Sequence, residues 1–432
     1  MRILLINSRM DMKQTLTRSD IKTLSLSSLG GALEFYDFIV FLTFIPILKQ
    51  HFFPEQSGLD SLMMIYGIYA VAYFVRPLSG MILAPFGDIV GRKRMFMISL
   101  FLMAVPTLAI GLLPTFDDIG VWAPLLLLCM RLLQGIALGG EVPSAHVFVT
   151  EHVKSHHMGL ANSLIAAGLT FGVFIGYAIS TSLNFIFTEA EIHAYAWRFP
   201  FIIGGGLGLL ALYLRRSLQE TPVFLQFKEE RKKSSEFPMK TVLQKYLKES
   251  FWGVMSTWLL MTGVIMVLLI PNLMKSELYG LPADFVNKIA LLATAMNIIG
   301  SVIAGLLVDR IGLPRTMIVF ATILGISSTI FFNALGQGGD HTLIALLYMA
   351  SSLFLGLVAC VPIFIVRLYE PRVRLSGMGF SYNIGNALFG GLTTFLVPVI
   401  AEQLNENFVT HYLIFLCVLG VALGFVAKRF RL

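Results

Sequence analysis

Long apolar runs dominate the hydrophobic pattern of this chain. They recur twelve times, each about 18–27 residues long, and short polar segments separate them. A run of that length crosses the apolar core of a bilayer as an α-helix. The pattern therefore predicts twelve transmembrane helices, over residues 27–48, 61–85, 95–114, 121–148, 158–184, 198–214, 251–274, 285–307, 315–334, 342–367, 375–400 and 408–427.

The longest polar interruption falls in the middle of the chain, at residues 215–250, and is rich in Lys and Arg. It leaves six apolar runs on each side. We therefore predict an N-terminal six-helix bundle over 1–214, a cytoplasmic linker over 215–250 and a C-terminal six-helix bundle over 251–432. No cleavage-type site follows the first apolar run, so we interpret that run as a retained membrane span.

Composition supports the same class. Of the 432 residues, 56% are hydrophobic and 13% are charged, whereas a soluble domain carries about 25% charged residues. The three cysteines, Cys129, Cys360 and Cys417, lie inside apolar runs, so they indicate no disulfide framework. We predict an all-α integral membrane protein.

The net charge of +7 is distributed in a way that indicates topology rather than nucleic-acid binding. Every second connection is basic, and the connections between them are poor in Lys and Arg. Because basic connections stay on the cytoplasmic side, both termini and the linker are predicted to be cytoplasmic. The basic connections carry Arg92, Lys93, Arg94, Lys154, Arg310, Arg315, Arg372 and Arg374.

An internal repeat links the two halves. GDIVGRKR, from Gly87 to Arg94, follows the second apolar run, and GLLVDRIGLPR, from Gly305 to Arg315, follows the eighth. Each copy has an aspartate at a cytoplasmic helix end, a glycine three residues later and a basic residue beyond. A duplicated six-helix unit accounts for this repeat.

These features resemble the major facilitator superfamily over nearly the full chain, and within it the metabolite:proton symporters. The repeated loop matches the superfamily's pattern between helices two and three, with Ile89 where Arg is usual. Six collinear segments resemble the symporters: Glu34-Phe35-Tyr36-Asp37-Phe38, Arg76-Pro77-Leu78, the run from Arg131 to Glu141, Trp197-Arg198-Phe199-Pro200-Phe201, Glu220-Thr221-Pro222-Val223-Phe224, and the run from Arg372 to Gly391.

The resemblance implies the major facilitator fold and import of a small polar solute driven by protons across a bacterial inner membrane. Its members include importers of proline/betaine, alpha-ketoglutarate, citrate, dicarboxylates and shikimate. The chain departs from the pattern at Phe35, where Trp is usual, and at Val142-Pro143-Ser144, where WGG is usual. Both departures lie near the expected cavity, so the substrate stays open between a zwitterion and a carboxylate.

Glu34 and Asp37 lie inside the first apolar run and share a helix face. Acids inside the membrane are costly and usually functional. We expect them to form a proton site, with or without a direct role in binding a cationic group; the alternative is a structural pairing with Arg76 or Arg131. The sequence does not choose between the two acids.

Helix four supplies the next candidates. Arg131, near mid-membrane, is expected to couple proton movement, to bind a substrate carboxylate or to form a structural ion pair. Gln134 shares its face and is expected to orient the guanidinium. Glu141, nearer the cytoplasm, is expected to pass protons inward or to pair with Arg76. His146 suits a proton relay by its chemistry, although packing is the commoner role of such a histidine.

Charged residues at the cytoplasmic helix ends are expected to hold an inward gate shut, or merely to set topology. They are Asp88, Arg92, Glu151, Asp309, Arg310 and Arg315. Polar residues elsewhere are candidates for the cavity wall, the alternative being hydrogen bonds between helices. They are Tyr36, Tyr66, Asn297, Tyr382, Asn383 and Asn386, with Arg131 and Gln134.

The sequence thus predicts a proton-coupled symporter and not an enzyme, acting as a monomer on a small solute, without cofactor, metal or nucleic acid. An exporter or proton antiporter of the same fold is the alternative. Antiporters of the superfamily carry a Gly-Pro pair in helix five, and residues 158–184 contain no proline. No phosphate-binding loop or cluster of metal ligands occurs in the sequence.

Overall fold

The computed structural model describes residues 16–53, 61–232, 237–276, 278–393, 397, 400 and 407–432. Within these ranges every regular element is a helix. Ten of the helical segments are long and apolar enough to cross a membrane. The other two predicted spans, 61–85 and 375–400, contain residues whose side chains or backbone lie outside the description. The prediction of an all-α membrane protein is confirmed.

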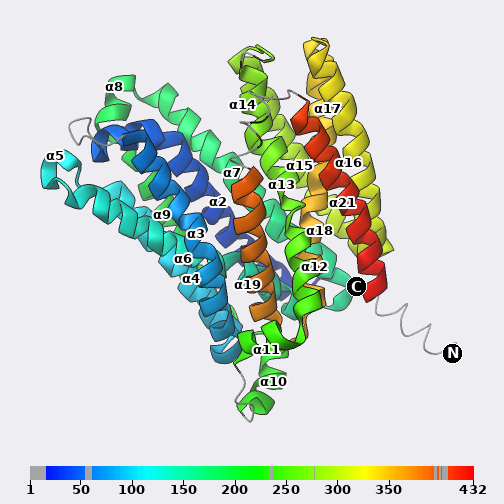
Figure 1. Ribbon diagram of the computed structural model, residues 1–432. Coiled ribbons are helices and arrows are strands. Elements are labelled where there is room, and N and C mark those ends of the chain that lie inside the picture. The colour runs from blue at the N-terminus through cyan, green and yellow to red at the C-terminus, as the bar shows by residue number, and fades with distance from the viewer. Residues whose placement is uncertain are drawn as a thin grey trace.

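Six long helices form the N-terminal half of the fold, drawn from blue to green in Figure 1. Most of them extend beyond the apolar runs, because polar residues continue the first and last turns. They are α2 (Arg18–Phe52), α3 (Ser61–Val90), α4 (Arg92–Leu112), α6 (Trp122–His152), α7 (Met158–Ile186) and α9 (Arg198–Arg215). Short elements join them: α5 (Phe116–Ile119), η2 (Ser155–His157), α8 (Glu189–Glu191) and η3 (Ile192–Ala196).

The helices of the C-terminal half are more interrupted. The seventh span is built from α12 (Leu247–Thr257), α13 (Leu260–Gly263), η4 (Val264–Leu269) and α14 (Ile270–Lys275), and the tenth from α17 (His341–Phe354), η5 (Leu355–Ala359) and α18 (Cys360–Leu368). The uninterrupted helices are α15 (Ala283–Ile311), α16 (Leu313–Gly336) and α21 (Phe408–Phe430). The eleventh span begins as α19 (Arg374–Gly385) and η6 (Asn386–Gly390).

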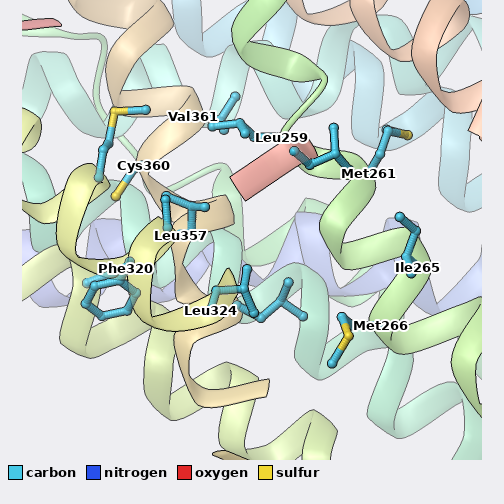
Figure 2. Close-up of a cluster of buried hydrophobic side chains, with 14 of the residues drawn as sticks. Leu259, Met261, Ile265, Met266, Phe320, Leu324, Leu357, Cys360 and Val361 are labelled. Carbon is cyan, nitrogen blue, oxygen red and sulfur yellow. The ribbon is translucent and has the colours of Figure 1, made fainter. Parts of the chain in front are cut away.

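A buried apolar core holds these pieces together. Figure 2 shows its centre, where Leu259, Met261 and Met266 of the seventh span face Phe320 and Leu324 of α16. Leu357, Cys360 and Val361 of the tenth span complete the cluster. The interrupted spans are therefore held by side-chain packing, which compensates for irregular backbone turns.

The two copies of the repeat adopt the same local structure. Gly91 separates α3 from α4 with φ +128°, and Gly312 separates α15 from α16 with φ +88°. Residues with a Cβ rarely adopt a φ in this range. The repeat therefore conserves a sharp turn between two helices, with Asp88 or Asp309 three residues before it.

The two halves meet along a few helices. α7 packs against α15, α3 against α19, and α6 against α18 and α19. The linker helices α10 (Pro222–Lys232) and α11 (Pro238–Lys245) lie at the lower end of the molecule in Figure 1, beyond α19, and the halves diverge toward the opposite end. We call the first of these the linker end. Arg215, assigned from sequence to the linker, is instead the last residue of α9 and fully buried.

Candidate functional site

A cavity of about 140 Å³ lies between the two halves. Its wall is mostly apolar: Phe35, Phe38 and Ile39 of α2 face Val264, Val267 and Leu268 of η4. The polar side chains in the wall are His146, Thr170, Asn297, Tyr382 and Asn386. No Asp, Glu, Lys or Arg is among the described residues that line it.

Irregular helix turns shape this cavity. η4 and η6 are single π-helical stretches, and both contribute to the wall. A π-turn widens the helix locally and is frequent at functional sites. Asn386 is the first residue of η6, and its amide nitrogen donates to the Tyr382 carbonyl at 2.8 Å. That bond holds the amide beside the cavity.

Asp37 belongs to a buried polar cluster inside the N-terminal half. Its Oδ2 lies 3.4 Å from Nη1 of Arg131. Its Oδ1 accepts hydrogen bonds from Thr107 at 2.8 Å and from Gln134 at 2.9 Å. Arg131 also donates to Gln134 at 2.8 Å and stacks over the Phe41 ring, 4.1 Å from its centre. The cluster joins α2, α4 and α6 and leaves Arg131 and Gln134 outside the cavity wall.

Glu34 has a different partner. Its Oε1 lies 3.4 Å from Nη2 of Arg76 on α3, and both side chains are buried. Its Oε2 has no hydrogen-bond partner among the described residues. Buried charges need a partner to offset the loss of hydration. Among the described residues, Arg76 is the charged partner of Glu34. Glu34 and Asp37 therefore face two separate arginines.

Glu141 pairs with Arg215, where the sequence suggested Arg76. Nη1 of Arg215 lies 2.9 Å from Oε1 of Glu141, and Ser99 donates to Oε2 at 2.5 Å. The Arg215 guanidinium also donates to the carbonyls of Leu26, Ser27 and Phe96. This partner could not be predicted from the sequence, because Arg215 is followed by a second arginine in a basic, polar stretch.

Two further predicted cavity residues lie elsewhere. The hydroxyl of Tyr36 donates to the Pro200 carbonyl at 2.7 Å, toward α9. Asn383 donates from one nitrogen to the carbonyls of Gly139 and Gly379, both at 2.8 Å, and so joins α19 to α6. The side chain of Tyr66 lies outside the description. Of the tyrosines and amides proposed from sequence, Tyr382, Asn386 and Asn297 line the cavity.

The repeated aspartates make matching contacts across the two halves. Oδ1 and Oδ2 of Asp309, on α15, accept from the backbone nitrogens of Gly159 and Leu160 at 2.7 and 2.8 Å. Asp88, on α3, accepts from the backbone of Ser376 at 2.9 Å and from its hydroxyl at 2.5 Å. Each aspartate thus caps the first turn of a helix in the opposite half, where the helix dipole favours a negative charge.

An ion-pair network adds to these caps at the linker end. Arg92 contacts Asp88 at 2.5 Å and Glu151 at 3.3 Å, and donates to the Pro371 carbonyl at 2.8 Å. Arg374 reaches across from the C-terminal half to Glu151 at 3.3 Å. We call Asp88, Arg92, Glu151, Asp309, Arg374 and Ser376 the linker-end contacts. Arg310 and Arg315, predicted for the same group, are exposed and form no ion pair with any described residue.

Sequence reasoning missed several members of this network. Glu220 accepts from the backbone nitrogen of Lys93 at 3.1 and 3.2 Å, and Thr221 donates to Glu151 at 2.8 Å. Both belong to the segment Glu220-Thr221-Pro222-Val223-Phe224, which resembles the symporters but whose sequence indicates no role. An acidic residue followed by Thr and Pro at a helix start was the available signal.

Two helical halves around an internal cavity, with charged contacts closing one end, are the architecture of a membrane transporter. The Major Facilitator Superfamily matches residues 27–393, and the chain belongs to this superfamily. The fold predicted from sequence is confirmed.

Curated relatives agree with this assignment. The inner membrane metabolite transport protein YhjE of Escherichia coli K12 is 30% identical over 393 residues, 90% of this chain and 88% of the relative. The proline/betaine transporter of the same organism is 28% identical, over 94% of this chain and 83% of the relative. Its shikimate transporter is also 28% identical, over 98% of both chains. The protein is therefore a transporter and not an enzyme, and the predicted resemblance is confirmed.

Solved structures share the fold. The proton:xylose symporter XylE bound to 6-bromo-6-deoxy-D-glucose has a TM-score of 0.76 at 16% identity, over 95% of both chains. A bacterial homologue of the iron transporter ferroportin, in its outward-facing state, has a TM-score of 0.68 at 14% identity, over 96% of this chain and 100% of that one. At these identities the likeness concerns the fold alone.

Proposed function

We propose that this protein is a proton-coupled symporter that imports a small polar organic solute by alternating access. The observation that carries the proposal is the Asp37–Arg131–Gln134 cluster, a buried acid held by one cation and two neutral donors. Such an acid can exist charged or neutral within one hydrogen-bond network. The names of the relatives, which include proline/betaine and shikimate transporters, support a small solute as cargo.

Protonation of Asp37 would change contacts rather than leave a charge without a partner. A neutral Asp37 loses its attraction to Arg131, but Arg131 keeps Gln134 and the Phe41 ring. Asp37 in turn keeps Thr107 and Gln134. The proton therefore weakens the attachment of α2 to α6 selectively, and this is the step that we assign to coupling.

The same helix carries the cavity wall. Phe35, Phe38 and Ile39 lie on the face of α2 toward the cavity, whereas Asp37 is turned into the N-terminal half. A shift of α2 that follows protonation of Asp37 would move this wall. Proton binding and solute binding would then act on one rigid element, as the coupling of two sites requires.

Import would end with the opening of the linker end. We propose that the linker-end contacts form the inward gate, because they join the two halves through Asp88, Asp309 and Arg374. Breaking them would let the halves rock apart at this end. Basic connections predict this end to be cytoplasmic.

The solute is either a zwitterion or a carboxylate. The rings of Phe35 and Phe38 favour a cationic ammonium group by cation–π attraction. Asn297, Asn386 and the hydroxyl of Tyr382 offer hydrogen bonds to a carboxylate. Direct binding by Arg131 would first require Asp37 to release it.

We further propose an oligomeric state, a membrane location and an energy source for the protein. The protein acts as a monomer in the bacterial inner membrane with both termini cytoplasmic, and it needs the proton gradient but no prosthetic group. Support comes from the basic connections and from the name of the inner membrane relative. The N-terminal bundle would end with Arg215, the linker would comprise residues 216–246, and the C-terminal bundle would begin with Leu247.

An exporter or antiporter of the same fold is the competing function. The absence of proline from α7 (Met158–Ile186) weighs against it. The glycines of α7 have a packing explanation, since a Cβ on Gly172 would collide with the backbone of Ala32 on α2. They therefore do not by themselves indicate an antiporter helix.

Proteoliposomes test the proposal. The protein is reconstituted with a pH-sensitive dye, and carboxylates, amino acids and betaines are added to the outside in turn. Symport predicts that one solute makes the external medium more alkaline while labelled solute accumulates. Acidification outside would establish antiport, and exchange of labelled solute without any proton movement would exclude proton coupling.

A further inference from the structure

His146 lies in the wall of the central cavity and has an unused ring nitrogen. The side chain is fully buried on α6. Its Nδ1 lies 2.9 Å from Oδ1 of Asn162 on α7, and its Nε2 has no hydrogen-bond partner among the described residues. A buried polar atom without a partner destabilises a structure unless a ligand or water supplies one.

The hydrogen bonds of Asn162 determine which nitrogen of His146 carries the proton. The amide nitrogen of Asn162 donates to the Met158 carbonyl at 2.9 Å and to the Thr150 hydroxyl at 2.8 Å. A carbonyl can only accept, so the amide oxygen must face His146. Nδ1 is therefore the donor, and in the neutral imidazole Nε2 is a bare acceptor.

Among the described residues that line the cavity, no charged side chain is present to pair with His146. Tyr382 is the one other titratable side chain among the described residues of the cavity wall. The acids on α6 and α2 are engaged elsewhere, and the charged residues of α15 and α18 lie at helix ends. The paired groups on α6 and α2 are Glu141 with Arg215, Glu151 with Arg92 and Arg374, Glu34 with Arg76, and Asp37 with Arg131. Those toward the helix ends are Asp284 with Lys288, Asp309 and Arg310 on α15, and Arg367 on α18. On α7 the one titratable side chain is Tyr177.

We propose that His146 binds the solute through Nε2, and that the solute is a small monocarboxylate that enters together with one proton. The proton from the outside binds Nε2, and the solute carboxylate accepts a hydrogen bond from the resulting N–H. No covalent bond of the solute changes, and proton and carboxylate leave together on the cytoplasmic side. This inference rests on the proposed function and specifies its substrate class.

The apolar wall makes the two binding events depend on each other. A lone imidazolium, or a lone carboxylate, would be an unpaired charge away from water, which is strongly unfavourable. Together they form a charge-assisted hydrogen bond with no net charge. The side chains of Asn386 and Tyr382 can donate hydrogen bonds to the second carboxylate oxygen. The apolar residues of α2 and η4 would contact the rest of the solute.

The same argument disfavours the other solute classes. A dicarboxylate would leave a second negative charge beside a wall without described cationic side chains. A betaine brings its own cation and has no donor for Nε2, so it would bind without taking up a proton. His146 is thus distinct from Asp37: its proton travels with the carboxylate, whereas the proton on Asp37 acts on the contact between α2 and α6.

Calorimetry on the purified full-length protein tests the inference. Lactate, glycerate and shikimate serve as monocarboxylates, with lactamide, succinate and glycine betaine for comparison. Titrations in buffers of different ionisation enthalpy report the protons taken up on binding. We expect a monocarboxylate to bind at least about tenfold more tightly than the comparison compounds, with net proton uptake. Tighter binding of succinate or betaine, no binding by any monocarboxylate, or binding without proton uptake overturns the inference.

Variants identify the residue. His146→Gln should weaken monocarboxylate binding at least about tenfold and abolish the proton uptake on binding. His152→Gln is the matched control, because His152 lies on the same helix and contacts its own Phe148 carbonyl at 2.9 Å. If His146→Gln binds like the wild type, the inference is wrong. If His146→Gln does not fold, the wild-type titrations above still decide.

A transport assay distinguishes failure of this inference from failure of the proposed function. Wild-type proteoliposomes are tested for lactate, glycerate and shikimate uptake driven by an imposed proton gradient, with empty liposomes as the blank. If the gradient drives uptake of none of the three monocarboxylates, the inference fails. If it drives no uptake of glycine betaine or proline in the same proteoliposomes either, the symport proposal fails with it. If the gradient drives equal uptake by the wild type and by the His146→Gln variant, the symport proposal stands and only the role of His146 is refuted.

Discussion

Glu34 and Asp37 lie three residues apart on α2, yet their carboxylates contact different arginines on different helices. Glu34 lies 3.4 Å from Arg76 of α3, and Asp37 lies 3.4 Å from Arg131 of α6. Asp37 also accepts two hydrogen bonds from neutral side chains, whereas Oε2 of Glu34 has no partner among the described residues. The two acids are therefore not equivalent, and their separate networks allow separate tests.

Replacing Asp37→Asn should lower proton-driven accumulation of the solute to the level that a proton carried on His146 alone can drive, and should preserve exchange of labelled solute across the membrane. Asparagine mimics the neutral acid: it still accepts from Thr107 or Gln134 and has no attraction to Arg131. The binding cavity is not touched by this change. The measurement compares gradient-driven uptake with counterflow in the same proteoliposomes.

Glu34→Gln provides the matched comparison. It removes one charge from the same helix at nearly the same depth, and it leaves the cluster around Asp37 intact. If Glu34→Gln loses accumulation and Asp37→Asn retains it, the coupling acid is Glu34. If both variants accumulate solute normally, neither acid carries the proton and our mechanism is wrong.

The Glu141–Arg215 pair should be mainly structural, and a double-mutant cycle can show this. Both side chains are fully buried, and the guanidinium packs over the Phe96 ring at 3.6 Å. Either single change, Glu141→Gln or Arg215→Gln, leaves one buried charge unpaired and should cost about 3–5 kcal/mol of stability. The double variant should recover much of this loss. Thermal unfolding in detergent, followed by size-exclusion chromatography, provides the measurement.

Transport by the double variant then tests Glu141 as a proton carrier. A folded protein without either charge should still accumulate solute if the pair is structural. A double variant that folds and exchanges labelled solute but fails to accumulate it would show that Glu141 takes part in proton coupling.

The fold was predictable from sequence because its determinants are local. The length of each apolar run fixes a membrane helix, and the repeat from Asp88 to Arg94 and from Asp309 to Arg315 encodes a turn whose glycine needs a positive φ. Helix ends were less predictable, since polar residues such as those of Arg18–Phe52 extend a helix beyond its apolar run.

The site was predictable in its residue types but not in its pairings. Asp37, Arg131 and Gln134 could be placed on two helices, and spacing put Arg131 and Gln134 on one face. The sequence left Asp37 to pair with either Arg76 or Arg131. The partner of Glu141 depends on how α9 packs against α2 and α4, which no local pattern records. His146 gained significance only when its distance to Asn162 and its place in the cavity wall were known.

Breaking the ion pair of Arg374 should favour opening of the linker end. Arg374→Gln removes a charged contact between the two halves, and such a bond contributes about 1.5–3 kcal/mol. The equilibrium between closed and open states should then shift roughly 10–150-fold toward opening. The rate at which a membrane-impermeant maleimide labels Thr170→Cys from the linker side reports this shift, after replacement of Cys129, Cys360 and Cys417.

Arg315→Gln is the control for this experiment. Arg315 carries the same charge near the same end but is exposed and forms no ion pair with a described residue. It should label at the parental rate. Equal acceleration of labelling in both variants would mean that the net positive charge at the linker end, and not the contact between Arg374 and Glu151, controls the opening.

The close approach of α7 and α15 should make the linker end sensitive to a single methyl group. A Cβ added at Gly305 would lie 2.7 Å from the Gly159 carbonyl oxygen, which is backbone and cannot rotate away. Gly305→Ala should therefore destabilise the closed state by about 1–3 kcal/mol and accelerate labelling of Thr170→Cys from the linker side. Gly336→Ala is the control, because nothing lies within 4 Å of its added Cβ. A Gly305→Ala protein that labels like the control would show that α7 and α15 separate freely and that this contact does not hold the end closed.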